Sequence, residues 1–308
     1  MPTVPGTAPP GEGPKTADHS PAERILVDAV RDGRCILFLG AGVHFPPPDG
    51  SPFTYPAEER PPLGGALAVQ LARDCNFANV VPDELPTLQR VSLCYEKELG
   101  RMKLVDQIRT AVEEGTRPSA AVRALAELPF SLIITTNYDT LFEKALRAAG
   151  KDPFVAWFDA KGDSPTGEYT PGKDPSAEAP FVFKVHGDVN HAESIVVTDE
   201  DYIGFVLRMS ASDRFHPIPE TFRYRFQKWP TLFVGYSLFD YNLRLLFRTL
   251  RWKIDKAEIP DSYSIDKRPD PLISDRWEKE QGFRFIAADV WDWVPWLYGE
   301  VLGREMSL

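Results

Sequence analysis

The sequence predicts an α/β protein: a largely parallel β-sheet with helices on both faces. Short apolar runs of strand length alternate with longer segments of helical periodicity over most of the 308 residues. Such alternation is typical of βαβ units, whose strands lie parallel in one sheet. The strand-like runs are also continuous, as expected for strands buried on both faces. We therefore expect a single α/β domain over residues 21–308.

Residues 1–20 differ in composition from the rest of the chain. They are rich in Pro, Gly, Thr and Ser and contain no apolar stretch of the kind found in a secretory signal. A segment of this composition cannot offset its ordering entropy, so we expect a disordered tail. No apolar run in the sequence approaches the roughly 18–20 residues that span a bilayer. These features predict a cytoplasmic protein without membrane contact.

The first half of the domain contains one strand and a helical insertion. A helix is expected over residues 21–33, where apolar residues have helical spacing and a glycine ends the pattern. The continuous apolar run 34–40 is the first expected strand. Seven prolines make residues 43–63 an irregular loop, which we expect to form a lid over a ligand. Residues 64–129 form the helical insertion, with helices expected at 64–75, 84–99, 102–115 and 119–129.

The second half returns to alternating strands and helices. Strand character reappears at residues 130–137, and a helix over 139–150 ends at a glycine. Residues 159–180, rich in Gly, Pro, Asp and Ser, form a second irregular connection. The later strands are expected at 153–158, 181–185, 194–197, 231–237 and 283–288. The later helices are expected at 199–210, 220–229, 240–257 and 292–303.

Charge and cysteine content argue against two classes of function. The formal net charge of −10 disfavours a general nucleic-acid binder, which normally presents a basic surface. The three cysteines, Cys35, Cys75 and Cys94, are widely separated. A structural zinc site needs about four closely spaced thiolate or imidazole ligands. We therefore expect no zinc or other metal site and interpret the cysteines as reduced small hydrophobes.

The first candidate motif follows the first expected strand, where Gly40, Ala41 and Gly42 occur in succession. A glycine turn after a buried strand matches the start of a dinucleotide-binding loop, whose backbone N–H groups approach a pyrophosphate. The complete G-x-G-x-x-G pattern is absent, and we expect no helix directly after Gly42. A plain glycine turn in a doubly wound fold explains the same residues. This motif alone does not decide between the two.

The second candidate motif lies at the end of the next expected strand, where Thr136, Asn137 and Asp139 occur. Open α/β sheets bind ligands at the carboxyl ends of their strands. Asp139 also suits a helix N-cap, which accounts for it without any ligand. Capping explains Asn137 less well, because its amide both donates and accepts hydrogen bonds and suits a ribose hydroxyl or a water.

Three further strand ends carry polar or glycine residues. His186 ends the strand Phe-Val-Phe-Lys-Val and is a core residue, a turn residue or a base that faces a ligand. Gly235 and Ser237 leave a later strand, Asn242 lies at the start of the helix that follows, and Val290 comes after the last strand. Because the carboxyl ends of parallel strands share one edge, we expect these residues to form a single site.

The ordered motifs Gly-Ala-Gly, Thr-Thr-Asn-Tyr-Asp, His-Gly-Asp and Gly-Tyr-Ser resemble those of the sirtuin superfamily. More narrowly, the chain is similar to the sirtuin-like effector domains of bacterial anti-phage defence. The similarity covers most of residues 22–300, and the ordered set is far more specific than any one motif. It implies a modified Rossmann-like fold that binds NAD.

The resemblance also implies a role for each matching residue. His186 would be the general base, Asn137 would hold the nicotinamide ribose or the attacking water, and Asp139 would lie beside it. Contacts with the pyrophosphate would come from the Gly-Ala-Gly turn, and contacts with the adenosine side from the last strands. The implied NAD-binding residues are Gly40, Ala41, Gly42, Val43, Thr136, Gly235, Ser237, Asn242 and Val290.

Two departures from protein-deacylating sirtuins bear on the reaction. Those enzymes usually carry a four-cysteine zinc module between the His-Gly and Gly-x-Ser motifs, and residues 187–234 contain no cysteine. They also have a serine two residues after the second glycine, where this chain has His44. The sequence therefore favours an NAD⁺ glycohydrolase that releases ADP-ribose and nicotinamide. A deacylase with an unusual substrate site and a non-catalytic NAD or ADP-ribose binding module remain open.

The family resemblance finally implies regulation. NAD-depleting effectors of defence systems act after infection and are held inactive until a trigger is present. The expected partners are therefore NAD, further copies of the chain and a separately encoded sensor protein.

Overall fold

The computed structural model of the chain describes residues 20–82, 84–161, 166–168, 174–210, 225–236 and 260–307. Of the expected tail, only Ser20 is among them. The helix expected over 220–229 lies partly outside the described residues, and the helix expected over 240–257 lies wholly outside them.

The described strands form one sheet in the order β4-β3-β5-β2-β1-β6-β7-β8. Every pairing in it is parallel except that of β3 with β4. The run β5-β2-β1-β6-β7-β8 repeats the strand order of the doubly wound dinucleotide-binding fold and confirms the expected fold class. The strands are β1 (Ile36–Leu39), β2 (Leu132–Thr135), β3 (Phe154–Trp157), β4 (Thr166–Gly167), β5 (Phe181–Lys184), β6 (Thr231–Val234), β7 (Ser262–Ile265) and β8 (Phe283–Ile286).

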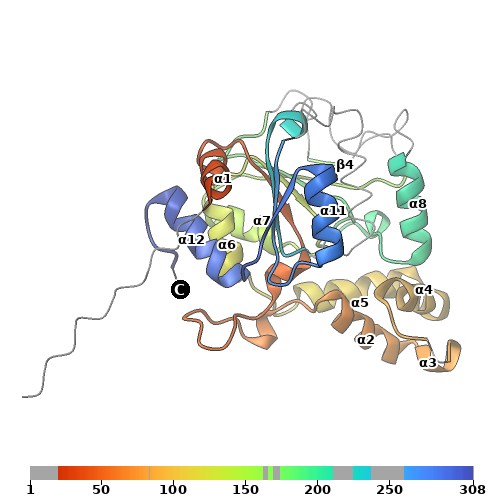
Figure 1. Ribbon diagram of the computed structural model, residues 1–308. Coiled ribbons are helices and arrows are strands. Elements are labelled where there is room, and N and C mark those ends of the chain that lie inside the picture. The colour runs from red at the N-terminus through yellow and green to blue at the C-terminus, as the bar shows by residue number, and fades with distance from the viewer. Residues whose placement is uncertain are drawn as a thin grey trace, which may run out of the picture.

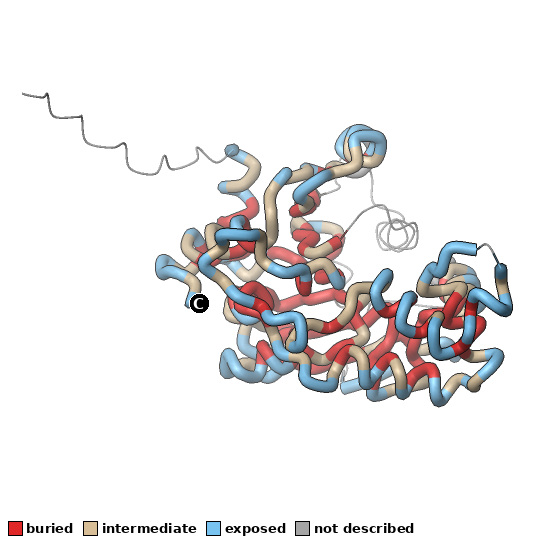
Figure 2. The backbone as a smooth tube through the Cα atoms, turned by 90° about the horizontal axis from the view of Figure 1, so that it is seen from below, coloured by how far each residue is buried: buried red, intermediate tan, exposed pale blue. Residues whose placement is uncertain are grey.

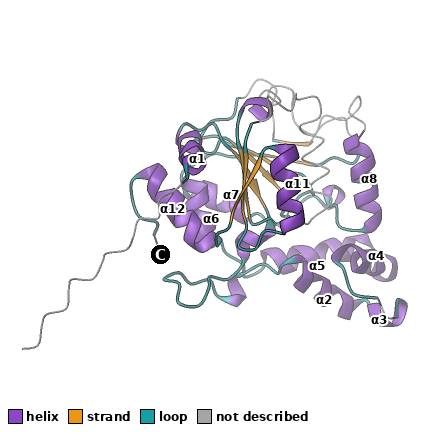
Figure 3. Cartoon of the chain, viewed as in Figure 1, coloured by secondary structure: helices purple, strands orange, loops and turns teal. Residues whose placement is uncertain are grey.

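Helices cover both faces of the sheet, as Figures 1 and 3 show. Successive residues of a strand point to opposite faces, so Leu37 and Leu39 of β1 belong to one apolar cluster and Ile36 and Phe38 to another. The helices in the first cluster are α1 (Pro21–Arg31), α6 (Ala120–Glu127), α7 (Leu141–Ala148) and α12 (Val290–Leu302). The helices in the second are α8 (Asp199–Ser210) and α11 (Pro271–Gln281). Buried segments accordingly run through the middle of the molecule in Figure 2, with exposed turns around them.

A third apolar cluster lies among the helices that follow β1. We call these helices the helical roof; they lie together beside the sheet in Figure 1. The roof consists of α2 (Gly64–Asp74), α3 (Phe77–Val80), α4 (Leu88–Leu99) and α5 (Arg101–Glu113). Val189, Ile195 and Val197, from the segment after β5, belong to the same cluster. The roof therefore packs directly on the chain that follows His186.

The structure departs from the sequence expectations at several places. Residues 194–197, expected as a strand, are not one: Ser194 ends a short 3-10 helix, Ala192–Ser194, and 195–197 are irregular. Ile195 and Val197 pack in the cluster of the helical roof, and Val196 packs in the cluster of α8 and α11. Another 3-10 helix, Ala41–His44, does begin at the Gly-Ala-Gly turn, and Ala57–Glu59 interrupts the proline-rich loop with a third. Strands β4 and β7 and helices α3 and α11 are additional elements that sequence patterns did not indicate, and β4 lies within residues 159–180, which were expected to be irregular.

The turns after β1 and β6 meet backbone to backbone. The Gly42 N–H donates to the Gly235 carbonyl at 2.8 Å, and the Gly40 N–H donates to the Val234 carbonyl at 2.9 Å. Gly235 has a φ of +74°, a conformation that side chains disfavour. A Cβ on Gly42 would lie 2.6 Å from the Gly235 carbonyl oxygen. The glycines of both turns are therefore required by this close approach of two backbones.

We predict that Gly42→Ala destabilises the fold, because the added methyl meets backbone atoms that cannot rotate away. Overpacking of this kind typically costs about 1–3 kcal/mol. Gly204→Ala is the matched control: a Cβ there meets nothing within 4 Å, and alanine in the middle of α8 should stabilise by about 0.5–1 kcal/mol. Denaturant unfolding of both variants measures the difference, and equal stabilities would contradict the close-approach interpretation.

Candidate functional site

A cavity of about 350 Å³ lies at the carboxyl edge of the central strands. It is bounded on one side by the turns after β1, β2 and β5 and on the other by α2, α4 and α5 of the helical roof. Five residues singled out in the sequence line it, namely Ala41, Thr136, Asn137, Asp139 and His186. The parallel sheet thus brings together residues that are widely separated in the chain.

Asn137 lines this cavity and has an amide oxygen without a hydrogen-bond partner among the described residues. Its backbone N–H donates to Thr135 Oγ1 at 3.0 Å, and Thr135 Oγ1 in turn donates to the Leu39 carbonyl at 2.7 Å, so β1 and β2 together fix its position. The side chain is 8% exposed, and Oδ1 has no hydrogen-bond partner among the described residues. A buried amide oxygen without a partner is costly, and a ligand hydroxyl or a water would satisfy it.

His186 is buried at the cavity wall and is held by aromatic edges. Its ring makes T-shaped contacts with Tyr202, at 5.2 Å between ring centroids, and with Phe205, at 5.3 Å. Its carbonyl accepts from the Val196 N–H, which ties the turn to the segment under the roof. In the same turn, the Asp188 carboxylate accepts hydrogen bonds from the Lys184 ammonium and from the Asn190 N–H.

Asp139 is paired with a second histidine that the sequence interpretation did not assign to the site. His44 also lines the cavity, and its Nε2 lies 3.5 Å from Asp139 Oδ2. Burial raises the pKa of the Asp139 carboxyl, but His44, Lys184 and the Leu141 N–H lower it by more, so the pKa lies below its usual range. Asp139 Oδ1 accepts from that Leu141 N–H at 3.0 Å. The expected capping role and a place at the cavity wall are therefore combined in one carboxylate.

Glu113 of α5 caps the same turn from the roof. Its carboxylate accepts from the Thr140 N–H at 2.5 Å and from the Thr140 hydroxyl at 2.9 Å. A carboxylate at the N-terminus of α7 also interacts favourably with the helix dipole. Glu113 lies 27 residues before Thr140, so no local sequence pattern marked it as a cap.

Several predicted NAD-binding residues do not line the cavity. Gly40, Gly42 and Gly235 form the backbone contact described above, and the Gly42 N–H is used in it. Val43 is fully buried in the core, and Val290, the first residue of α12, packs against the same core cluster. Ser237 and Asn242 lie outside the described residues, so their predicted contacts with the adenosine side remain predictions.

The proline-rich loop is anchored at its centre and reaches the cavity at its end. Phe53 and Tyr55 pack against Trp291 of α12, with ring centroids 5.8 and 6.3 Å apart. The Tyr55 hydroxyl donates to the Arg117 carbonyl at 2.9 Å and lies 3.4 Å from His44 Nδ1. Pro61 and Pro62 line the cavity. The loop supplies a wall that the core holds in place.

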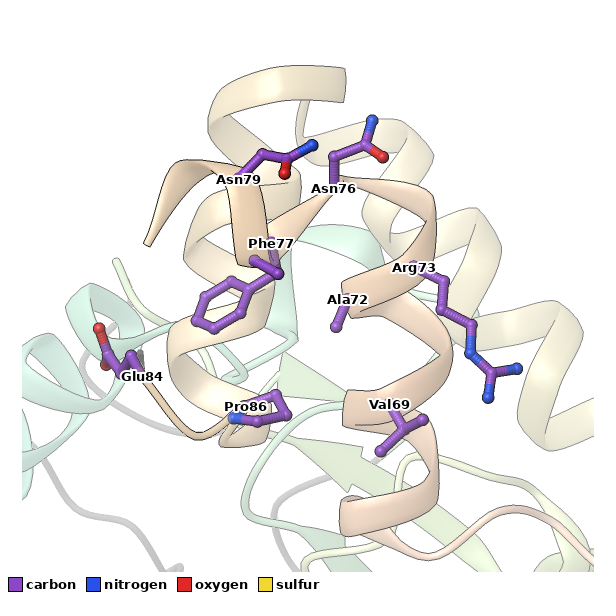
Figure 4. Close-up of a pocket in the computed structure, with 9 residues that line it drawn as sticks. Val69, Ala72, Arg73, Asn76, Phe77, Asn79, Glu84 and Pro86 are labelled. Carbon is purple, nitrogen blue, oxygen red and sulfur yellow. The ribbon is translucent and has the colours of Figure 1, made fainter. Parts of the chain in front are cut away.

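A second cavity of about 360 Å³ opens on the outer side of the roof. Figure 4 shows Phe77 of α3 and Pro86 beside Val69 and Ala72 of α2, with polar side chains around them. It shares no lining residue with the cavity at the carboxyl ends of the strands, which we call the strand-end cavity. We assign it no part in the chemistry of the strand ends.

Within the described ranges, no group of three or more His, Cys, Asp and Glu side chains has the arrangement needed to hold a metal ion. Within the same ranges, no helix has both the length and the apolar character needed to cross a bilayer.

Comparison with known proteins places these features in a family. A family model described as a SIR2-like domain matches residues 131–286, which include the turns after β2, β5 and β6. A NAD(+) hydrolase ThsA of Enterococcus faecium is 32% identical over 45% of this chain and 26% of its own length. Defense-associated sirtuin 2 of Bacillus subtilis is 26% identical over 92% of this chain and 26% of its own length. A NAD(+) hydrolase ThsA of Acinetobacter baumannii is 27% identical over 74% of this chain and 42% of its own.

These alignments cover less than half the length of each of those relatives. Among solved structures, a Sir2 bound to an acetylated peptide aligns with 90% of this chain and 97% of its own, at 15% identity and a TM-score of 0.37. The SIR2-like family model spans just over half of the 308 residues. On the strength of that match, the chain belongs to the SIR2-like domain family.

Proposed function

We propose that this protein is an NAD⁺ glycohydrolase, which converts NAD⁺ and water into ADP-ribose and nicotinamide. The observation that carries the proposal is the shared cavity of Asn137, Asp139 and His186 at the carboxyl edge of a doubly wound sheet. This edge is where such sheets bind dinucleotides. Relatives that bear the name NAD(+) hydrolase support the choice of substrate.

In the proposed reaction, no protein atom forms a covalent bond with the substrate. The bond between C1′ of the ribose and the nicotinamide nitrogen breaks, and its electron pair stays on nicotinamide. A water oxygen forms the new bond to C1′, and the water gives up one proton. The transition state resembles an oxocarbenium ion, so the protein needs to hold the substrate, stabilise positive charge and position the water.

The cavity residues suit these three tasks. Asn137 Oδ1, which has no partner among the described residues, is the proposed acceptor for a ribose hydroxyl or the attacking water. His186 is the proposed general base for the water or for a ribose hydroxyl. The low pKa of Asp139 keeps it a carboxylate at neutral pH, so it places a negative charge at the cavity wall. This charge would stabilise the positive charge that develops on the ribose in the transition state.

We further propose a role in bacterial anti-phage defence, in the cytoplasm where NAD is available for depletion. The name of the relative that aligns over nearly all of this chain, defense-associated sirtuin 2, supports this setting. An NAD-depleting enzyme must be inactive in healthy cells. We therefore propose that assembly with further copies of the chain or with a sensor protein switches the activity on.

Asn137→Ala and His186→Ala should each abolish nicotinamide release from NAD while the protein stays folded. Loss of a general base typically costs about 10²–10⁴-fold. Asn190→Ala and His191→Ala are matched controls, because they remove the same side chains outside the cavity lining and should leave the rate unchanged. Nicotinamide release is measured at low and high protein concentration, since self-assembly is a proposed trigger.

Adding an acyl-lysine peptide separates hydrolysis from deacylation. A glycohydrolase releases nicotinamide without the peptide, whereas a deacylase releases it only when the peptide is present. Full activity of the His186→Ala variant would overturn the proposed base. NAD binding without any turnover by the wild type, at all protein concentrations and with the peptide, would reject self-assembly as the trigger and leave a sensor-activated enzyme or a non-catalytic binding module.

We predict that Pro61→Gly/Pro62→Gly raises the Michaelis constant for NAD several-fold with little change in kcat. Glycines give this part of the loop more conformational freedom, so ordering the cavity wall costs more on binding. Pro46→Gly is the control, since Pro46 is exposed and lies in the same loop but does not line the cavity. An unchanged Michaelis constant in the double variant would reject a substrate-binding role for this wall.

A further inference from the structure

The side chain of Lys184 is completely buried at the end of β5. Removing an ammonium from water costs several kcal/mol even after the protein relaxes around it. Such a group is stable only where acceptors and negative charges surround it. Its partners therefore indicate what this buried charge accomplishes.

Three hydrogen bonds use the three N–H donors of the Lys184 ammonium. They run to the Tyr138 carbonyl at 3.1 Å, the Asp139 carbonyl at 2.6 Å and Asp188 Oδ2 at 2.6 Å. Glu143 Oε1 of α7 lies 3.0 Å from the same nitrogen as a further charge partner. The three N–H donors of the ammonium are thus all used, and Lys184 does not line the cavity at the strand ends.

The partners belong to two different turns of the candidate site. Tyr138 and Asp139 directly follow Asn137 in the turn after β2, and their carbonyls bond to the ammonium. Asp188 follows His186 by two residues in the turn after β5. A single buried group therefore bonds to the backbone of one turn and to a side chain of the other.

We propose that Lys184 is a positioning residue for the reaction, which fixes the turn that carries Asn137 relative to the turn that carries His186. This inference rests on the proposed function for its catalytic consequence. Misplacement of a reacting group by about 1 Å can cost on the order of 10²-fold in rate. Lys184 does not line the cavity and acts through two residues that do, Asn137 and His186.

Two variants separate this role from a general contribution to stability. Lys184→Met removes the ammonium and leaves the Asp139, Asp188 and Glu143 carboxylates buried without it. Lys184→Met/Glu143→Gln removes one positive and one negative charge, so the formal charge of the cluster equals that of the wild type. This double variant, which we call the charge-matched variant, restores the charge balance without restoring the hydrogen bonds to the two carbonyls.

Lys151→Met is a matched control. Lys151 also donates to a backbone carbonyl, that of Leu128 at 2.5 Å, and it does not line the cavity. This variant should retain wild-type behaviour in both measurements described below.

The first measurement is hydrogen exchange of residues 136–140 without NAD, which reports local opening of the turn. The charge-matched variant should unfold cooperatively and yet exchange at least about 10-fold faster there than the wild type. The second is nicotinamide release, where kcat should fall at least about 10-fold and the Michaelis constant should change much less. The exchange measurement needs no turnover, so it tests Lys184 independently of the proposed function.

Three results would overturn the proposal. The first is wild-type exchange over residues 136–140 in the charge-matched variant. The second is nicotinamide release by that variant at the wild-type rate. The third is failure of the charge-matched variant to fold, because Lys184 would then be needed for the fold itself rather than for the placement of two turns.

Discussion

The buried ammonium of Lys184 joins chain segments that lie 46 residues apart, and the geometry of the strand-end cavity depends on it. Burial lowers the pKa of this ammonium, but Glu143, Asp188 and Asp139 raise it by more, so the group stays charged. Burial and the nearby Asp139 raise the pKa of Glu143, Lys184 lowers it, and the pKa lies above its usual range. The cluster therefore combines one firmly held cation with carboxyl groups of different acidity beneath the cavity.

Around this cluster, each neighbouring element holds one part of the cavity in place. Gly42 and Gly235 lock the turns after β1 and β6 through their backbones. Glu113 holds the start of α7 from the roof, and Tyr55 anchors the proline-rich loop beside His44. The cavity is consequently built from segments that the sequence separates widely but that the parallel sheet collects at one edge.

Much of this arrangement was predictable from local sequence patterns, and the exceptions have physical causes. Continuous apolar runs identified β1, β2, β5 and β6, and strand polarity then predicted that Asn137 and His186 would meet. The same rule failed for residues 195–197, because an apolar run also fits an irregular segment covered by helices. Strand β7 was not predicted, because two of its four residues are serines and so it lacks a continuous apolar run, although both serines are buried. Lys184 was visible as a lysine within an apolar strand, but its partners are tertiary and no local pattern names them.

The central claim is that the strand-end cavity is where this protein binds NAD. Hydrogen exchange of the wild-type chain with and without saturating NAD tests it most directly, because it maps contacts without requiring turnover. Protection is predicted in the turns after β1, β2 and β5, at residues 40–44, 136–140 and 186–188. Protection confined to other segments, such as the outer face of the roof around Phe77, or no protection at all, would contradict the account.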